Sequence, residues 1–179
     1  GINIGPNKET KNKIEDYYYC FEKLASHSNY ITINISSPNT EGLRDFHEKT
    51  EMEKLLKGLN KIKKEKNLKQ PFVLKLSPDI NNDDISSIIE LIKKYNIEGI
   101  IISNTTDRNR DNLIDAKKSE AGGLSGLPLK DISTQLIKKF HKEIKGDIQI
   151  IGVGGVDSGK SAFEKITAGA DAVQLYTGM

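Results

Sequence analysis

Short runs of β-branched residues alternate with amphipathic segments along this chain of 179 residues, and that alternation constrains the fold most. Strands that alternate with helices are typical of βαβ units, whose strands form a parallel sheet. The expected strands are Ile2–Gly5, Tyr30–Ile35, Phe72–Leu76, Gly99–Ser103, Gln149–Val153 and Ala172–Tyr176. The sequence therefore predicts a wound or barrelled α/β domain.

Five segments between these strands place apolar residues at helical spacing, so each is expected to bury one helix face against the sheet. The stripes are Ile14/Tyr17/Tyr18/Phe21/Leu24, Met52/Leu55/Leu56/Leu59, Ile85/Ile88/Ile89/Ile92, Ile132/Leu136/Ile137/Phe140/Ile144 and Phe163/Ile166. No linker interrupts them, so residues 1–179 are expected to form one domain. Six strands would leave two unpaired edges and would not close an eight-stranded barrel. We therefore expect part of a longer domain.

Composition excludes several classes of protein. The chain is 36% apolar and 29% charged, which is typical of a globular domain. Its net charge of +2 is too small to indicate a nucleic-acid partner. No apolar run approaches the ~18 residues that a transmembrane helix needs. Cys20 is the single cysteine, and no Cys/His spacing is typical of a metal site, so no metal is expected.

Polar or glycine-rich sequences follow directly after four of the expected strands. They are Ser36–Thr40, Ser77–Asp79, Asn104–Thr106 and Gly154–Gly155. Ligands of parallel α/β folds bind at the carboxyl ends of the strands. This placement predicts one site that is built from several loops.

The glycine-rich segment Gly152–Gly159 connects a strand to a helix near the end of the chain. Glycine lets backbone N–H groups approach a phosphate, and the following helix adds a favourable dipole. The segment predicts a phosphate site, to which Tyr176 and Thr177 after the last strand would contribute. The alternative is a tight turn that needs glycine only for its backbone conformation.

Residues 154–161 also read GGVDSGKS, which matches the Walker A pattern of nucleotide hydrolases. Only 18 residues follow Ser161, and none of them supplies a second strand that ends in a metal-binding aspartate. A P-loop ATPase or GTPase would also leave the earlier strand-end sequences unexplained. It is kept as the rival function.

Ser37 lies at the end of a strand, and Pro38 holds the chain extended there. A serine is a weak base unless neighbours stabilise its deprotonated form or accept its proton. None of the histidines (His27, His47 and His141) lies near Ser37 in sequence, so a relay of hydroxyls or water would be needed. The alternative is a turn or helix-cap residue.

Asn3, Asn34, Asn39 and Asn104 all lie on strands or just past their ends. Each amide offers donors and an acceptor, and a group of them suits a planar polar heterocycle. Lys75 lies between two leucines in an apolar strand, where an unpaired charge is costly, so we expect it to meet an anion or an electron-rich ligand. A lysine whose end group reaches solvent is the alternative.

Two connections exceed the usual 2–6 residues of βα loops. They run from Ser36 to about His47 and from Asn104 to about Leu129, and both are candidate lids. The second contains Glu120–Gly126, whose glycines could bring backbone close to a ligand. A disordered insertion over Asp107–Lys118 is the alternative there.

Several motifs together resemble one family. They are INIGPNK, INISSPNTEGLRD, LKLSPD, ISNTT, EAGGLSGLPL, IIGVGGVDSG and AGADAVQLYTGM. From Asn3 to Met179 the sequence resembles the class 2, quinone-linked dihydroorotate dehydrogenases. That family has a parallel (β/α)₈ TIM barrel that binds FMN, oxidises dihydroorotate to orotate in pyrimidine biosynthesis, and passes electrons to a membrane quinone.

The resemblance assigns roles residue by residue. It implies that Ser37 is the base that removes the C5 proton of dihydroorotate, and serine rather than cysteine in this motif indicates class 2. The residues implied to hold the substrate are Asn34, Asn39, Asn104 and Thr105. Those implied to hold FMN are Asn3, Asn34, Lys75, Ser103, Gly126, Gly154, Gly155, Tyr176 and Thr177.

The resemblance also implies parts outside this sequence. Two barrel strands and a helical pair that docks on the membrane and admits quinone are expected before Gly1, and a final helix after Met179. We therefore expect the isolated 179-residue chain not to turn over. The implied location is the bacterial cytoplasmic membrane or, alternatively, the mitochondrial inner membrane.

Overall fold

A computed structural model describes residues 1–179 except 109, 112, 145–147, 177 and 179. Six parallel strands form one sheet in the order in which they occur along the chain. They are β1 (Ile2–Ile4), β2 (Ile31–Asn34), β3 (Phe72–Leu76), β4 (Gly99–Ile102), β5 (Gln149–Val153) and β6 (Ala172–Gln174). All six expected strands are confirmed; β1, β4 and β6 end one or two residues earlier than expected, and β2 is one residue shorter at each end.

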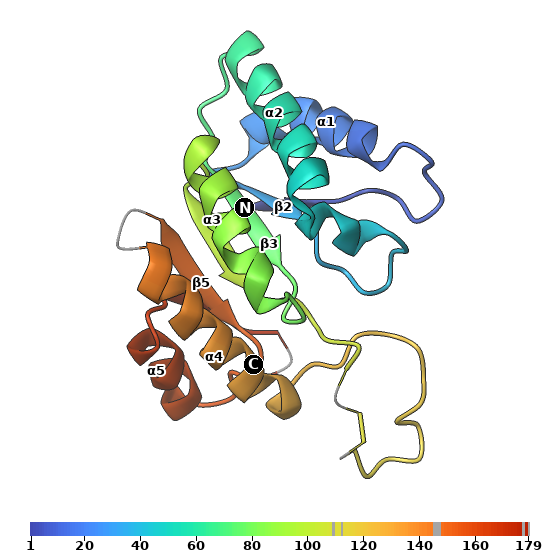
Figure 1. Ribbon diagram of the computed structural model, residues 1–179, viewed down its shortest axis with the longest axis vertical. Helices are drawn as coiled ribbons and strands as arrows, with labels where there is room; N and C mark the ends of the chain where they lie inside the picture. The colour runs from blue at the N-terminus through green and yellow to red at the C-terminus, as the bar shows by residue number, and fades with distance from the viewer. Residues whose placement is uncertain (109, 112, 145–147, 177, 179) are drawn as a thin grey trace.

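Five α-helices connect the strands and lie along one face of the sheet (Figure 1). They are α1 (Lys13–Leu24), α2 (Lys49–Glu65), α3 (Asn82–Lys94), α4 (Leu127–Ile144) and α5 (Gly159–Thr167). Short 3₁₀ helices η1 (Ala25–His27) and η2 (Leu43–His47) follow α1 and precede α2. Right-handed crossovers between neighbouring parallel strands put every helix on the same side, so the fold is part of a barrel.

The main core lies between the sheet and the helices, and it follows the alternation of side chains along each strand. On β3, Phe72 and Leu74 are fully buried against the helices. Four of the five helical stripes supply the other half, as in α2, where Met52, Leu55, Leu56 and Leu59 are buried. The helices therefore dock as the periodicity predicts.

The expected stripe of α5 is wrong. Phe163 is 66% exposed and Ile166 42% exposed, whereas Ser161 and Lys165 are buried. Ser161 forms the capping box of this helix with Ser158, which turns its side chain inward. Residues four apart share a face of a helix, so Lys165 also points inward and Phe163 points away.

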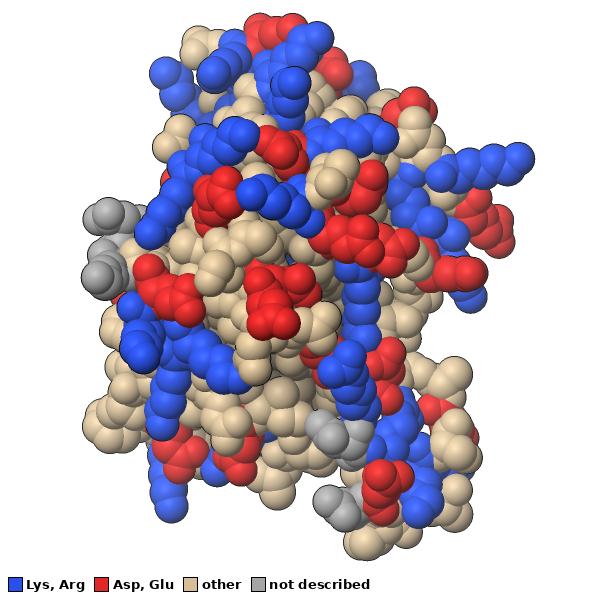
Figure 2. All heavy atoms as spheres, viewed as in Figure 1, with Lys and Arg blue, Asp and Glu red and all other residues tan. Residues whose placement is uncertain are grey.

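The opposite, inner face of the sheet has a much smaller apolar cluster of Val73, Ile101 and Val153, flanked by Tyr30 and Ile151. Polar side chains occupy the positions nearer the carboxyl ends. On the outer helix face, Lys/Arg and Asp/Glu side chains are interspersed (Figure 2), and ion pairs such as Lys94–Glu53 at 2.5 Å join α3 to α2. No helix among the described residues has the length and apolar character to cross a membrane.

Candidate active site

A cavity of about 610 Å³ opens at the carboxyl ends of the strands, which is a usual size for a small-molecule site. Residues of every strand or of the loop after it contribute to its wall. The predicted site residues that line it are Asn3, Asn34, Ser37, Lys75, Ser103, Asn104, Thr105, Gly126, Gly154, Gly155 and Tyr176. Groups far apart in sequence are thus brought to one rim of the sheet.

The amides of Asn34 and Asn104 are fixed by a hydrogen-bonded cluster at one side of this cavity. Asn104 Nδ2 donates to Asn34 Oδ1 over 3.2 Å and to Ser36 Oγ over 3.0 Å. Ser36 Oγ in turn donates to Asn34 Oδ1 over 3.0 Å. The Asn34 backbone is held from outside by Tyr17 OH, which donates to its carbonyl over 2.6 Å. The two amides are therefore preorganised for a planar polar ligand.

Ser37 is half-buried at the rim of the cavity. Its Oγ accepts a hydrogen bond from Asn39 N–H over 3.2 Å, and the described residues supply no histidine or carboxylate to it. The buried His47 is engaged elsewhere, because its Nε2 accepts from Ser77 N–H over 3.2 Å. Any proton that Ser37 takes up must therefore leave through water or another hydroxyl.

Lys75 extends from the inner face of β3 into the cavity and is 7% exposed. Burial lowers the pKa of its ammonium group. Its Nζ lies 5.5 Å from the centre of the Tyr176 ring, and none of the ion pairs of the described residues includes it. An anionic or electron-rich ligand would offset the cost of burying this charge.

Gly154 and Gly155 directly follow β5 and have left-handed backbone at φ 110° and 65°. They pass so close to the start of α4 that a Cβ at Gly154 would lie 2.8 Å from Leu129 Cδ2, and one at Gly155 would lie 2.8 Å from Gly126 O. Side chains are thus excluded on that side, and backbone forms this part of the cavity wall. Such a surface suits a phosphate.

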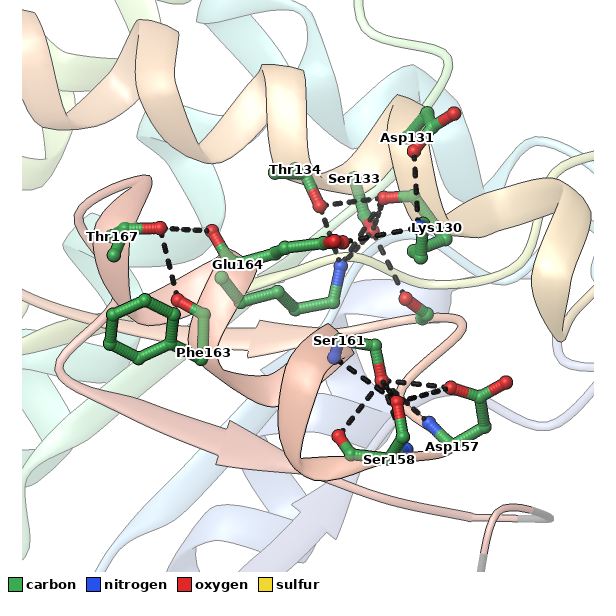
Figure 3. Close-up of polar contacts among 12 residues, drawn as sticks. Lys130, Asp131, Ser133, Thr134, Asp157, Ser158, Ser161, Phe163, Glu164 and Thr167 are labelled. Atoms are coloured by element: carbon green, nitrogen blue, oxygen red, sulfur yellow. Dashed lines mark hydrogen bonds and ion pairs between the residues drawn. The ribbon is translucent and has the colours of Figure 1, made fainter.

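The Walker A match receives a different role in this fold. Ser161 Oγ, the hydroxyl that would bind magnesium, accepts from the N–H groups of Asp157 and Ser158 over 3.0 Å each. It also contacts Asp157 Oδ1 at 2.9 Å, and Figure 3 shows the three side chains together. Lys160 is exposed and does not line the cavity. The sequence is a helix cap, and nothing supports the P-loop alternative.

An ion-pair cluster ties together the loops after β2, β3 and β4. Arg44 Nη2 lies 3.0 Å from Asp79 Oδ2, and Arg44 Nη1 lies 2.9 Å from Asp107 Oδ1. Thr106 Oγ1 donates to the other oxygen of Asp79 over 2.6 Å. The hydrogen bond from Arg44 lowers the pKa of Asp107. This cluster fixes the loop that carries Ser37.

The long connection after β4 extends away from the sheet and returns to α4, as Figure 1 shows in yellow. Thr106 and Leu124 form an antiparallel bridge at its base. Gly123 packs directly on the Thr105 side chain, and a Cβ there would lie 3.0 Å from Pro38 Cγ. The two connections expected as lids therefore touch each other; the first also contains η2 rather than only loop.

Two predicted residues lie apart from the others. Asn39 is exposed and does not line the cavity, although its backbone N–H contacts Ser37. Thr177 lies outside the described residues. Sequence reasoning gave no role to Arg44 or Asp79, although both belong to motifs that carried the resemblance.

Comparisons with known proteins agree on one family. The family model for dihydroorotate dehydrogenase matches residues 1–179. A dihydroorotate dehydrogenase (quinone) of Wigglesworthia glossinidia brevipalpis is 47% identical over 186 residues, covering 100% of this chain and 55% of the relative. One of Christiangramia forsetii is 43% identical over 180 residues, covering 99% and 53%.

Solved structures give the same result for the fold. A crystal structure of a dihydroorotate dehydrogenase from Eimeria tenella in complex with ferulenol superposes with a TM-score of 0.95 at 30% identity. It covers 100% of this chain and 52% of that one, so the fold is a partial TIM barrel. The chain spans about half the length of the relatives that it matches. On this evidence the chain belongs to the dihydroorotate dehydrogenase family.

Proposed function

We propose that this protein oxidises dihydroorotate to orotate in pyrimidine biosynthesis, with FMN as bound cofactor and a quinone as second electron acceptor. The observation that carries the proposal is the single cavity in which the Ser37 hydroxyl, the amide cluster, the Lys75 ammonium and the late glycines meet. The names of its relatives support the same reaction. On this proposal residues 1–179 belong to one (β/α)₈ domain.

The residues present fit FMN. The backbone wall at Gly154 and Gly155 packs so closely on the start of α4 that a Cβ at either position would clash, and this bare backbone suits the phosphate. Lys75 would lie against the flavin ring, where its positive charge would stabilise the negative charge of the reduced form. The other proposed cofactor contacts come from Asn3, Asn34, Ser103, Gly126, Tyr176 and Thr177. FMN, when bound, supplies the hydride acceptor of the reaction.

Ser37 acts in this proposal as the base toward the C5 proton of dihydroorotate. The hydrogen bond from Asn39 N–H would stabilise negative charge developing on Oγ. Asn34, Asn104 and Thr105 would hold the pyrimidine ring and its carboxylate through amide and hydroxyl groups, whereas Asn39, which does not line the cavity, would contribute through the hydrogen bond from its backbone N–H to Ser37. Because the rim is held by Arg44 and Asp79, the base keeps its position while the lid covers the substrate.

The quinone implies that the protein works at a membrane. The bacterial sources of the relatives favour the cytoplasmic membrane over the mitochondrial inner membrane. Contact with the quinone would come from the helical pair that the resemblance implies before Gly1.

Colour tests the proposal in the purified full-length protein. We expect a yellow protein that bleaches when dihydroorotate is added without oxygen and regains its colour when a quinone is added. A yellow protein that does not bleach would contradict the substrate, and a colourless protein would contradict the cofactor. Hydrolysis of ATP by a colourless preparation would favour the P-loop alternative.

A further inference from the structure

Lys165 on α5 is a completely buried lysine that lies outside the cavity wall. Its Nζ donates to Ser133 Oγ over 2.7 Å, to Thr134 Oγ1 over 3.1 Å and to Lys130 O over 3.3 Å. All three acceptors belong to the beginning of α4, and Figure 3 shows them gathered on one side of that helix. Among the described residues, no carboxylate forms an ion pair with it.

The partners of Lys165 stand directly behind the glycine wall. Ser133 Oγ lies 3.3 Å from the carbonyl oxygen of Gly154 and 3.1 Å from that of Lys130, either of which can accept its proton. Gly155 packs on Lys130, where a Cβ would lie 2.6 Å from Lys130 Cβ. Lys165 thus connects α5, the start of α4 and the glycine wall through one hydroxyl.

A buried ammonium without a carboxylate is costly, and neutral oxygens repay that cost only in part. A methionine of similar length would fill the same space without that cost. The buried charge of Lys165 would be offset if an anion bound on the cavity side of the Gly154 and Gly155 wall, because opposite charges attract strongly across a region that excludes water. Gly154 and Gly155 face the cavity at that place.

We propose that Lys165 is a positioning residue for the glycine wall and a buried positive charge that favours binding of a phosphate group there. This inference rests on the proposed function, since the phosphate is that of FMN. Lys165 does not touch the ligand; it acts through Ser133, Gly154 and the electric field behind them.

The affinity for FMN should depend on pH. Burial lowers the pKa of Lys165 to about 8, and the groups that face it are Lys130, which lowers it further, and Asp131 and Glu164, which raise it. A bound anion favours the charged lysine, so binding raises this pKa. Affinity for FMN should therefore fall as the pH rises from 7 to 9, while affinity for riboflavin, which lacks the phosphate, should not.

The test compares dissociation constants of FMN and riboflavin, measured by flavin fluorescence in the full-length apoprotein. We expect Lys165→Met to weaken FMN about 10- to 100-fold, leave riboflavin within about twofold, and abolish the dependence on pH. Lys160→Met is the matched control, because it removes an exposed charge from the same helix and should change neither constant. Ser133→Ala should weaken FMN alone, and it keeps the inference testable if Lys165→Met does not fold.

Two results would overturn the inference. Equal losses of FMN and riboflavin in Lys165→Met would reduce the residue to a structural role. Inorganic phosphate can be titrated into the wild type and into Lys165→Met while the amide NMR signals of Gly154 and Gly155 are followed. Equal shifts in the two proteins would show that the charge of Lys165 does not favour phosphate binding, whether or not flavin binds. Failure of the wild-type protein to bind either flavin would instead contradict the proposed function, and the phosphate titration would still decide the role of Lys165.

Discussion

Replacing Gly155 by alanine tests the close approach on which the phosphate cradle depends. The residue has φ of 65°, and a Cβ would lie 2.6 Å from Lys130 Cβ, 2.8 Å from Lys130 Cα and 2.8 Å from Gly126 O. Two of these three atoms are backbone, and they belong to different parts of the loop and helix. A rotamer change cannot relieve the overlap, so the loop or the start of α4 must move.

The expected cost has two parts. Left-handed backbone costs a residue with a side chain about 1–2 kcal/mol, and overpacking typically costs a further ~1–3 kcal/mol. Gly155→Ala should therefore lower the free energy of unfolding by roughly 2–5 kcal/mol, if the two costs add. In a protein of this size each kcal/mol shifts the melting temperature by about 2–4 °C, so a decrease of at least ~4 °C is expected.

Gly159→Ala is the matched control. Gly159 opens α5 with no heavy atom within 4 Å of an added Cβ, so alanine should be neutral or stabilise by about 0.4–1 kcal/mol. Urea unfolding of both variants and of the wild type measures the difference. If the free energy of unfolding of Gly155→Ala were within ~0.5 kcal/mol of the wild type, Gly155 would lie in an ordinary turn and the close packing against α4 would be contradicted. FMN affinity should fall in Gly155→Ala and remain unchanged in the control.

Three further predictions concern Ser37, the Arg44 ion pairs and His47. Ser37→Ala should keep its flavin, but stopped-flow absorbance should show reduction by dihydroorotate slowed by ~10²–10⁴-fold, and an unchanged rate would remove Ser37 from the mechanism. Arg44→Met leaves the Asp79 carboxylate, 6% exposed, without its ion-pair partner and should lower the free energy of unfolding by about 3–5 kcal/mol, measured by urea unfolding. Asp107→Asn at the exposed end of the cluster should lower it by at most ~1 kcal/mol, and equal costs would contradict a buried Arg44–Asp79 pair. Burial lowers the pKa of His47, so the unfolded chain takes up a proton below pH ~6.5 that the folded one does not. The free energy of unfolding should accordingly decrease from pH 7 to 5, and a His47→Gln variant should lose that part of the pH dependence.

Most of the fold follows from local sequence because the four central strands β2–β5 and four of the helices bury apolar side chains that recur with strand or helix periodicity. The exception, α5, shows the limit of periodicity. Its orientation is set by the Ser161 cap and by a buried lysine, neither of which contributes to an apolar pattern. Phe163 and Ile166 have the spacing of a buried helix face, but they lie on the exposed side of α5.

The site was predictable to the extent that it depends on topology. Parallel strands bring their carboxyl ends together, so polar residues after successive strands had to meet. Contacts between loops could not be predicted in this way, because Arg44, Asp79 and Asp107 pair across long stretches of sequence. The same holds for Ser36. Its hydroxyl joins the amides of Asn34 and Asn104, but in the sequence it cannot be distinguished from any other serine of a loop.

The two faces of the sheet divide stability and function between them. The outer face buries the large apolar core under the helices, so the fold does not depend on the inner face for most of its hydrophobic stabilisation. Among the described residues, the inner face has a small apolar cluster around Val73. The positions nearer the carboxyl ends of the strands are therefore available to Asn34 and Lys75. In the part of the chain that the structure describes, Lys75 is buried there without an ion-pair partner, a cost that the proposed ligand would offset. For this reason a substitution such as Lys75→Met should stabilise the unliganded protein while weakening its hold on an electron-rich ligand, since it removes a desolvated charge and the contact that the charge serves.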